Sequence, residues 1–226
     1  MREKIVYVEG ESDKIFLTLL KKVKNLCIDD IVSCKGNTKL FEKAEDIKGY
    51  LKAKDIYIVF DSDNQKRETK IQEIKKQLQE DPGEEHRLND EEFNQIKIFL
   101  LPENDESQHN PEYCELEHLL EKMAKESENK AFYTSFHQHY NALCDKFEEI
   151  HQNQTPNRRE QKKHAKCWLQ PYITLSICLK KGFIPCGMDD LDPTEATAKI
   201  AEQRNTEILK KLFDFDLTEL QALIDF

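Results

Sequence analysis

Residues 56–64 read Ile56-Tyr57-Ile58-Val59-Phe60-Asp61-Ser62-Asp63-Asn64. The first five are apolar and either β-branched or aromatic, which is typical of a short strand buried on both faces of a sheet. The run stops at two carboxylates two residues apart. In an open parallel sheet, ligands bind just beyond the carboxyl ends of the strands. We therefore expect Asp61 and Asp63 at an edge of the sheet where a hard cation can bind, although Asp, Ser and Asn also favour an ordinary turn.

Other apolar runs predict three more strands, and helical spacing of apolar residues predicts helices between them. Because strands alternate with helices, we expect an α/β fold with a mainly parallel, four-stranded sheet flanked by helices. The additional strands are expected at Ile5–Val8, near Ile28–Cys34 and at Ile96–Leu101, and the helices after Asp13, over about Leu40–Leu51 and over about Arg67–Gln79.

The pattern changes after about residue 105. Residues 103–111 are polar and loop-like, and from residue 112 to the end only helical spacing is found. A helix over about residues 160–181 is expected to bury Trp168, Leu169, Tyr172 and Ile173. We therefore expect an α/β domain over residues 1–120 and a helical extension over residues 121–226 packed on it.

Composition limits the functional classes. The 226-residue chain has a net charge of −10, so it does not attract nucleic acid by bulk charge, and such binding needs a basic patch, metal ions or a partner. Its seven cysteines form no Cys-x-x-Cys pair and are odd in number, which favours reduced thiols in the cytoplasm over a disulfide framework or a zinc ribbon. No apolar run approaches the length that spans a membrane, so we expect a cytoplasmic protein without membrane association.

Acidic residues follow two of the predicted strands. Glu9 comes after the first strand, and Asp61 and Asp63 close the third. Neighbouring parallel strands end at the same edge of a sheet, so these three carboxylates are expected to form one site suited to Mg²⁺ or Mn²⁺. Glu117, near the start of the helix after the fourth strand, is in a position to reach the same edge.

Spacing argues against several other sites. An EF-hand beginning at Asp61 would need Gly and Glu where the chain has Lys66 and Gln72. The chain contains no P-loop or Rossmann glycine pattern, and its histidines are scattered, which argues against a zinc site.

Together, Val8-Glu9-Gly10-x-x-Asp13 and the later Asp61-x-Asp63 resemble the Toprim domain, the metal-dependent domain of topoisomerases, primases, ribosomal-RNA maturases and overcoming-lysogenization-defect (OLD) nucleases. The resemblance covers roughly residues 3–120 and is closest to small, stand-alone OLD-like proteins. Two further matches are the turn Gly36-Asn37-x-Lys39 and the pattern Leu116-Glu117-x-Leu119-Leu120.

The resemblance implies a Rossmann-like Toprim fold and assigns roles to these residues. Glu9 would bind metal or act as general acid or base, Asp61 and Asp63 would be the metal-binding pair, and Glu117 would be a further ligand. Asp13 matches the position at which OLD-like nucleases bind another metal, although an Asp there also suits a helix cap. One or two Mg²⁺ or Mn²⁺ ions would then act on a phosphodiester. OLD-like enzymes also use a lysine beyond this domain, and Lys163 in the basic run 158–166 is the first choice, followed by Lys166.

The function expected from the resemblance is metal-dependent endonuclease cleavage of DNA or RNA, with a role in defence against phage as one setting. Two alternatives stay open. One is an RNA-processing maturase that uses the same site, and the other is an effector or regulatory subunit that acts only with an ATPase partner. Whether the chain forms homo-oligomers also stays open.

Overall fold

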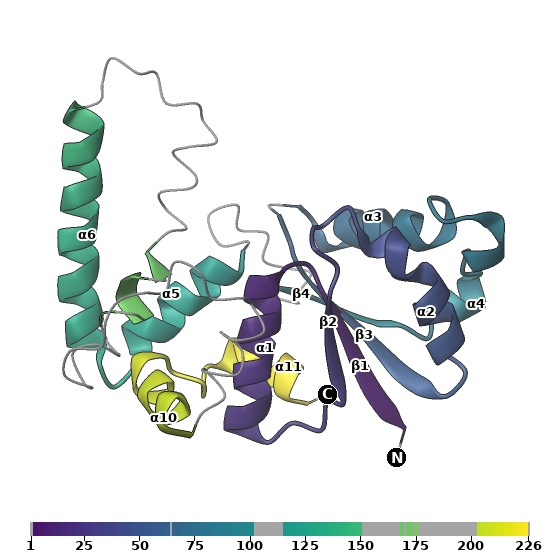
Figure 1. Ribbon diagram of the computed structural model, residues 1–226, viewed down its shortest axis with the longest axis horizontal. Coiled ribbons are helices and arrows are strands. Elements are labelled where there is room, and N and C mark those ends of the chain that lie inside the picture. Colours follow the sequence, from purple (N-terminus) through teal and green to yellow (C-terminus); the bar gives the residue numbers. More distant parts are fainter. Residues whose placement is uncertain are drawn as a thin grey trace.

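The computed structural model describes residues 2–63, 65–101, 115–150, 168, 169, 171–173, 175 and 203–225 (Figure 1). Within these ranges, short helices and 3₁₀ turns supplement the predicted elements. The strands are β1 (Glu3–Val8), β2 (Asp30–Ser33), β3 (Lys54–Asp61) and β4 (Lys97–Leu101), and the helices are α1 (Glu11–Lys24), η1 (Leu40–Lys43), α2 (Ala44–Tyr50), α3 (Arg67–Gln79), η2 (Glu84–His86), α4 (Asp90–Phe93), α5 (Leu116–Glu126), α6 (Lys130–Ile150), α10 (Gln203–Leu212), η3 (Thr218–Leu220) and α11 (Gln221–Ile224).

The four strands form one parallel sheet in the order β2-β1-β3-β4. Val8 near the end of β1 is paired with Val59 of β3 and with Ser33 of β2, so the strands end at one edge. The predicted α/β class with a four-stranded parallel sheet and flanking helices is confirmed. The second predicted helix begins instead as the 3₁₀ turn η1, and α4 was not predicted because four residues are too few for a helical period.

The strands that follow β1 in the sequence are added on its two opposite sides. From β1 it passes through α1 to β2 on one side, and β3 then lies on the other side of β1. Figure 1 shows α1, α5 and α10 on one face of the sheet and α2, α3 and α4 on the opposite face. This arrangement creates a topological switch point between the ends of β1 and β3, which is where open α/β sheets bind ligands.

Alternate residues of the strands build two separate cores. Val6, Val8, Tyr57 and Val59 pack on the face of α1 and α5. The intervening residues pack on the face of α2 and α3, and comprise Ile5, Tyr7, Ile56, Ile58 and Phe60. Both faces of β1 and β3 are therefore buried, as the unbroken apolar run at residues 56–60 predicted.

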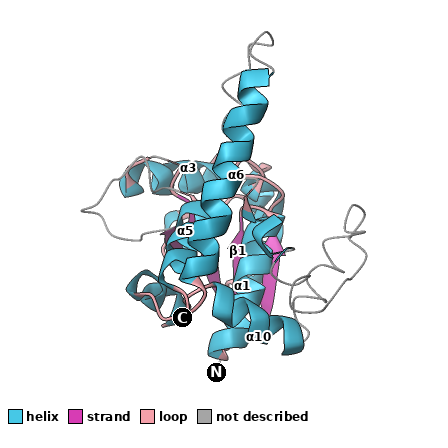
Figure 2. Cartoon of the chain, turned by 90° about the vertical axis from the view of Figure 1, so that its left-hand side faces the viewer, coloured by secondary structure: helices cyan, strands magenta, loops and turns pink. Residues whose placement is uncertain are grey.

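The C-terminal helices share the core on the α1 face. Leu119 of α5, Leu209 of α10 and Leu223 of α11 belong to the same buried cluster as Val6 and Val8. Helix α6 runs past α5 and extends beyond the rest of the described fold (Figure 2). None of the described helices is long and apolar enough to cross a membrane.

Two of the four predicted apolar anchors of the 160–181 region are buried in this core. Trp168 and Tyr172 are buried, whereas Leu169 and Ile173 are partly exposed and pack against the same core cluster. Tyr172 contacts five aromatic rings: those of Phe132, Tyr133, Phe136, Trp168 and Phe213. Most of the predicted helix lies outside the described residues.

Candidate carboxylate site

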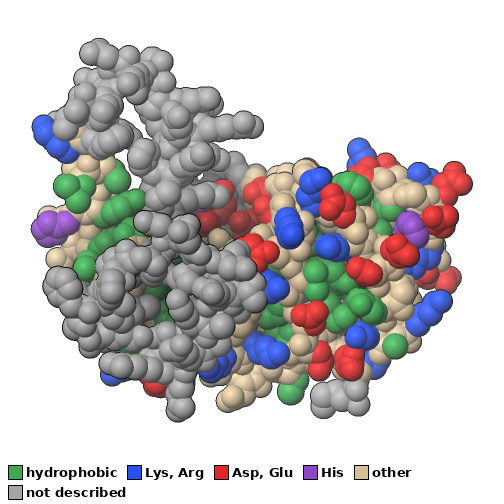
Figure 3. All heavy atoms as spheres, in the orientation of Figure 1, with side chains coloured by type: hydrophobic (Ala, Val, Ile, Leu, Met, Phe, Trp, Pro, Cys, Tyr) green, Lys and Arg blue, Asp and Glu red, His purple; other side chains and the backbone are tan. Residues whose placement is uncertain are grey.

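The sheet brings the three strand-end carboxylates to one edge. Glu9 follows the last residue of β1, Asp61 is the last residue of β3, and Asp63 lies two residues beyond it. Because β1 and β3 are neighbours in parallel register, Glu9 and Asp61 flank the switch point of the sheet. Figure 3 shows acidic side chains in the middle of this view, where the strands end and α5 begins.

Asp61 is at the centre of the acidic group. Its side chain is buried, and its Oδ1 accepts a hydrogen bond from the backbone N–H of Leu116 at 2.9 Å. Burial raises the pKa of the Asp61 carboxyl well above its usual range, and the nearby negative charges of Asp13, Glu9, Glu117 and Asp63 raise it further. The other four predicted acidic site residues therefore all act electrostatically on Asp61.

Asp13 combines the two roles considered for it. It lies in the first turn of α1, is 6% exposed, and its Oδ2 accepts a hydrogen bond from the backbone N–H of Gly10 at 2.8 Å. This bond ties the start of α1 to the loop that carries Glu9. The same carboxylate is, after burial, the strongest influence on the pKa of Asp61. Asp13 is therefore a helix-start residue that also belongs to the acidic group.

Asp63 is held from the opposite face of the sheet. Its backbone has a φ of 50°, in the left-handed region, which turns the chain sharply after β3. Its Oδ2 accepts hydrogen bonds from Nζ of Lys70 in α3 and, at 3.3 Å, from Nδ2 of Asn37. The Lys70 side chain is 4% exposed, so this is a largely buried ion pair on the lysine side.

Lys70 was not among the site residues predicted from the sequence. A signal for it was nonetheless present, because Lys70, Ile74 and Leu78 are spaced four apart and share one face of α3. Ile74 and Leu78 are fully buried, so a lysine on that stripe is directed toward the sheet. A lysine in this position needs a carboxylate partner, and Asp63 provides it.

The turn after β2 connects these parts. The backbone N–H of Gly36 donates to the carbonyl oxygen of Glu9 at 2.8 Å, and the carbonyl oxygen of Asn37 accepts from Nε2 of Gln77 in α3 at 2.7 Å. Gly36 has a φ of 139°, which favours glycine. Cys34, just before the turn, is a poor nucleophile because burial raises the pKa of its thiol to about 12.

The donor chemistry of the site fits a hard divalent cation. Carboxylate oxygens from two strand ends and two helix starts are the ligands that Mg²⁺ and Mn²⁺ prefer. Among the residues that the structure describes, no three His, Cys, Asp or Glu side chains are already arranged to hold an ion.

Lys162, Lys163 and Lys166 fall outside the described residues, so the prediction for Lys163 stays a prediction.

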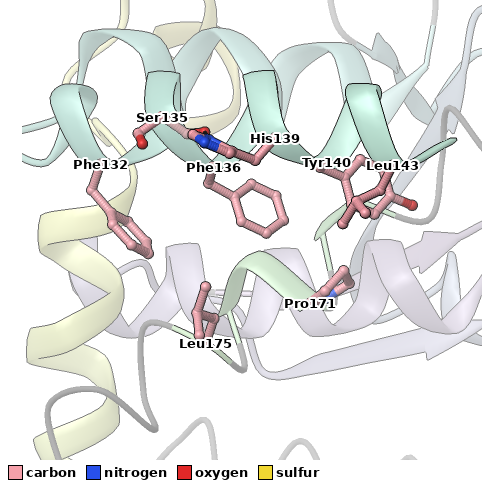
Figure 4. A pocket seen from close by; sticks show the side chains of 8 residues that line it. All are labelled: Phe132, Ser135, Phe136, His139, Tyr140, Leu143, Pro171 and Leu175. Atoms are coloured by element: carbon pink, nitrogen blue, oxygen red, sulfur yellow. Dashed lines mark hydrogen bonds between the residues drawn. The ribbon is translucent and has the colours of Figure 1, made fainter. Parts of the chain in front are cut away.

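An apolar pocket is separate from the acidic group. It has a volume of about 420 Å³ and lies between α6 and the segment at residues 171–175 (Figure 4). Phe132 and Phe136 face Pro171 and Leu175 across it, and none of the five acidic site residues lines it. Its lining is mostly apolar and contains no carboxylate side chain.

Comparison with known protein families identifies a related family. The profile of the family described as "Protein of unknown function (DUF3226)" matches residues 3–172, which is more than half of the chain and includes all five acidic site residues. No curated protein and no solved structure matches the chain.

Proposed function

The chain belongs to the DUF3226 family, and we propose that it is a metal-dependent nuclease that hydrolyses phosphodiester bonds at the edge of its sheet. One observation carries the proposal: the buried Asp61 lies at the switch point of a parallel sheet and within the field of four other carboxylates. Concentrating that much negative charge is unfavourable without a cation. The resemblance of Glu9, Asp61 and Asp63 to the Toprim pattern supports the same reaction.

The residues of the chain have separate tasks in this reaction. Glu9, Asp61 and Asp63 hold Mg²⁺ or Mn²⁺, with Glu117 and Asp13 beside them. The bound ion supplies Lewis acidity toward a phosphodiester oxygen and lowers the pKa of a water molecule. Glu9 also takes the proton from the attacking water, and the backbone N–H groups of Gly10 and Leu116 keep Asp13 and Asp61 in place.

The negative net charge of the chain affects how it binds a nucleic-acid substrate. At a net charge of −10, the chain repels a polyanion overall, so we expect weak, salt-sensitive binding that divalent metal strengthens. The same observation favours a second candidate function, in which the chain is an effector subunit that cuts only with an ATPase partner. In that case the partner supplies the affinity for nucleic acid.

The test is cleavage by the purified chain. Plasmid DNA, single-stranded DNA and structured RNA are each incubated with Mg²⁺, Mn²⁺ or EDTA, using wild type, Glu9→Gln and Asp63→Asn. We expect cleavage only with metal, reduced at least about 1,000-fold in both variants, which corresponds to roughly 4 kcal/mol of transition-state stabilisation. Asp216→Asn is the matched control, because Asp216 is an exposed carboxylate outside the site, and it should cut at the wild-type rate.

The outcomes separate the two candidates. Cleavage in EDTA, or equal cleavage by wild type and both site variants, contradicts the proposal. If the chain binds metal but cuts none of the three substrates alone, and cuts once an ATPase encoded by a neighbouring gene is added, the effector function is the correct one.

A further inference from the structure

Lys70 is a buried cation beside the proposed metal site. The residue is 3% exposed, and its Nζ donates to Oδ2 of Asp63. An ammonium group loses its hydration when buried and is retained only where a negative group compensates for the loss. The pairing therefore stabilises Lys70 and fixes the direction of the Asp63 side chain.

The charges around the site are divided between the two faces of the sheet. Asp13 comes from α1 and Glu117 from α5, which lie on one face. Lys70 comes from α3, on the opposite face, and Asn37 binds the same Oδ2 atom of Asp63 at 3.3 Å. The carboxylates are thus concentrated on the α1 and α5 side, and a fixed positive charge closes the α3 side.

This division restricts where a divalent cation can bind. On the α3 side, Oδ2 of Asp63 is already engaged by Lys70 and Asn37, and the ammonium group repels any other cation nearby. On the other side, Asp13 in the first turn of α1 and Glu117 in the first turn of α5 add their negative charges to that of Asp61.

We propose that Lys70 is a positioning residue that holds the Asp63 carboxylate and limits the site to one divalent cation per chain. The ammonium group takes the place of a second cation on the α3 side. This inference rests on the proposed function, because it concerns the same site. It goes further by specifying the number of ions and the protein group that sets it.

The experiment counts bound ions without relying on cleavage. The full-length chain is stripped with EDTA, dialysed and titrated with Mn²⁺ by calorimetry, and paramagnetic resonance then detects Mn²⁺ pairs. The variants are Lys70→Met, Lys70→Gln and Lys70→Arg. Lys75→Met is the matched control, because Lys75 lies on the same helix and is paired with an aspartate, Asp90, at 2.8 Å. Thermal melts establish which variants are folded.

We expect one Mn²⁺ per chain in wild type, Lys70→Arg and Lys75→Met. Whichever of the two neutral variants is folded should bind two Mn²⁺ and show the exchange-coupled signal of a pair. The turnover of that neutral variant should fall, whereas the arginine variant should retain activity. A merely structural role for Lys70 would instead lower the stability of the neutral variant without adding an ion. Two ions in wild type, or one ion in a folded neutral variant, overturns the inference.

Failure of the inference is distinguishable from failure of the proposed function. If wild type binds one Mn²⁺ but cleaves no substrate, the nuclease proposal fails, while the ion count still decides the role of Lys70. If wild type cleaves with metal but the neutral variants keep a single ion, only the role of Lys70 is overturned. A wild-type chain that binds no Mn²⁺ removes the basis of both.

Discussion

Oδ1 of Asp61 accepts a hydrogen bond from the backbone N–H of Leu116 at 2.9 Å, joining the end of β3 to the start of α5 across 55 positions of sequence. The donor belongs to the first turn of α5, where backbone N–H groups have no partner within the helix. This bond brings Glu117, the next residue, to the edge of the sheet. Asp61 therefore has two roles, as the acceptor that anchors α5 and as a buried carboxylate of the acidic group.

Asp61→Asn separates these roles, because the amide oxygen can still accept the hydrogen bond while the charge is lost. In EDTA at neutral pH, we expect the variant to be more stable than wild type by about 1–3 kcal/mol, since it relieves like-charge repulsion and desolvation of a buried carboxylate. Chemical denaturation followed by circular dichroism measures the difference. Metal-dependent cleavage should be lost at the same time.

The pH dependence of this difference has a definite sign. The pKa of Asp61 is raised in the folded state, so the folded chain holds the proton more tightly than the unfolded chain. The stability contributed by Asp61 is complete below the unfolded pKa of about 3.9 and is lost as the pH rises through the higher folded pKa. The gain in Asp61→Asn should therefore grow with pH.

Asp90→Asn is the control for this pH dependence. Hydrogen bonds from Lys75 and Gln79 lower the pKa of Asp90, so its contribution is present above the unfolded pKa and lost on acidification. The control variant should be slightly less stable than wild type at neutral pH and equal to it at low pH. The same trend in both variants would contradict the assignment of Asp61.

Gly36→Ala tests the turn that connects Glu9 and Asn37. Gly36 has a φ of 139°, where a Cβ atom is strained, so we expect a loss of about 1–3 kcal/mol in the free energy of unfolding. Gly49→Ala is the matched control, because Gly49 is exposed within α2 and a Cβ there meets nothing within 4 Å. That substitution should stabilise the chain by about 0.5–1 kcal/mol, and urea denaturation would measure both.

If Gly36→Ala is as stable as wild type, the turn does not have the described conformation in solution. If it is destabilised but binds Mn²⁺ as wild type does, the turn is only structural. We expect weaker Mn²⁺ binding, because the N–H of Gly36 holds the carbonyl of Glu9 and the neighbouring Asn37 contacts Asp63.

The central fold was predictable because local and global signals agree there. The unbroken apolar run at residues 56–60 predicted a strand buried on both faces, and both cores of the structure meet at β3. Helix α3 occupies Arg67–Gln79, as its sequence predicted. The order of the strands was not predictable, because the sequence pattern does not reveal on which side of β1 each later strand pairs.

The carboxylates of the site were found because they follow apolar strands, and strand ends are where parallel sheets bind ligands. Lys70 was missed, and Asn37 was noted only as part of a turn, for a physical reason. Their positions depend on tertiary packing, since Lys70 reaches Asp63 from a helix on the opposite face from α1 and α5. A charged helix is ordinarily solvated, and only the buried neighbours Ile74 and Leu78 distinguish this lysine from the others.

Tyr172→Ala tests the packing of the segment at residues 171–175 against the rest of the fold. Tyr172 is fully buried among aromatic rings, including Tyr133 and Phe213 at centroid distances of 5.5 and 6.0 Å. We expect a loss of about 3–5 kcal/mol in the free energy of unfolding. Leu175→Ala, at a side chain that is 41% exposed, should cost less than about 1 kcal/mol. Equal losses would show that Tyr172 is not part of the core.

Alanine substitutions test whether the basic run at residues 158–166 takes part in cleavage. Lys163 is predicted to act because OLD-like proteins, which the chain resembles, place a lysine at the start of a late helix. A lysine beside the phosphate would offset the charge that develops in the transition state, so Lys163→Ala should lower turnover by about 10- to 1,000-fold and change KM less. Single-turnover cleavage with Lys162→Ala and Lys166→Ala in parallel identifies the residue. If all three variants cut at the wild-type rate, the basic run takes no part in cleavage.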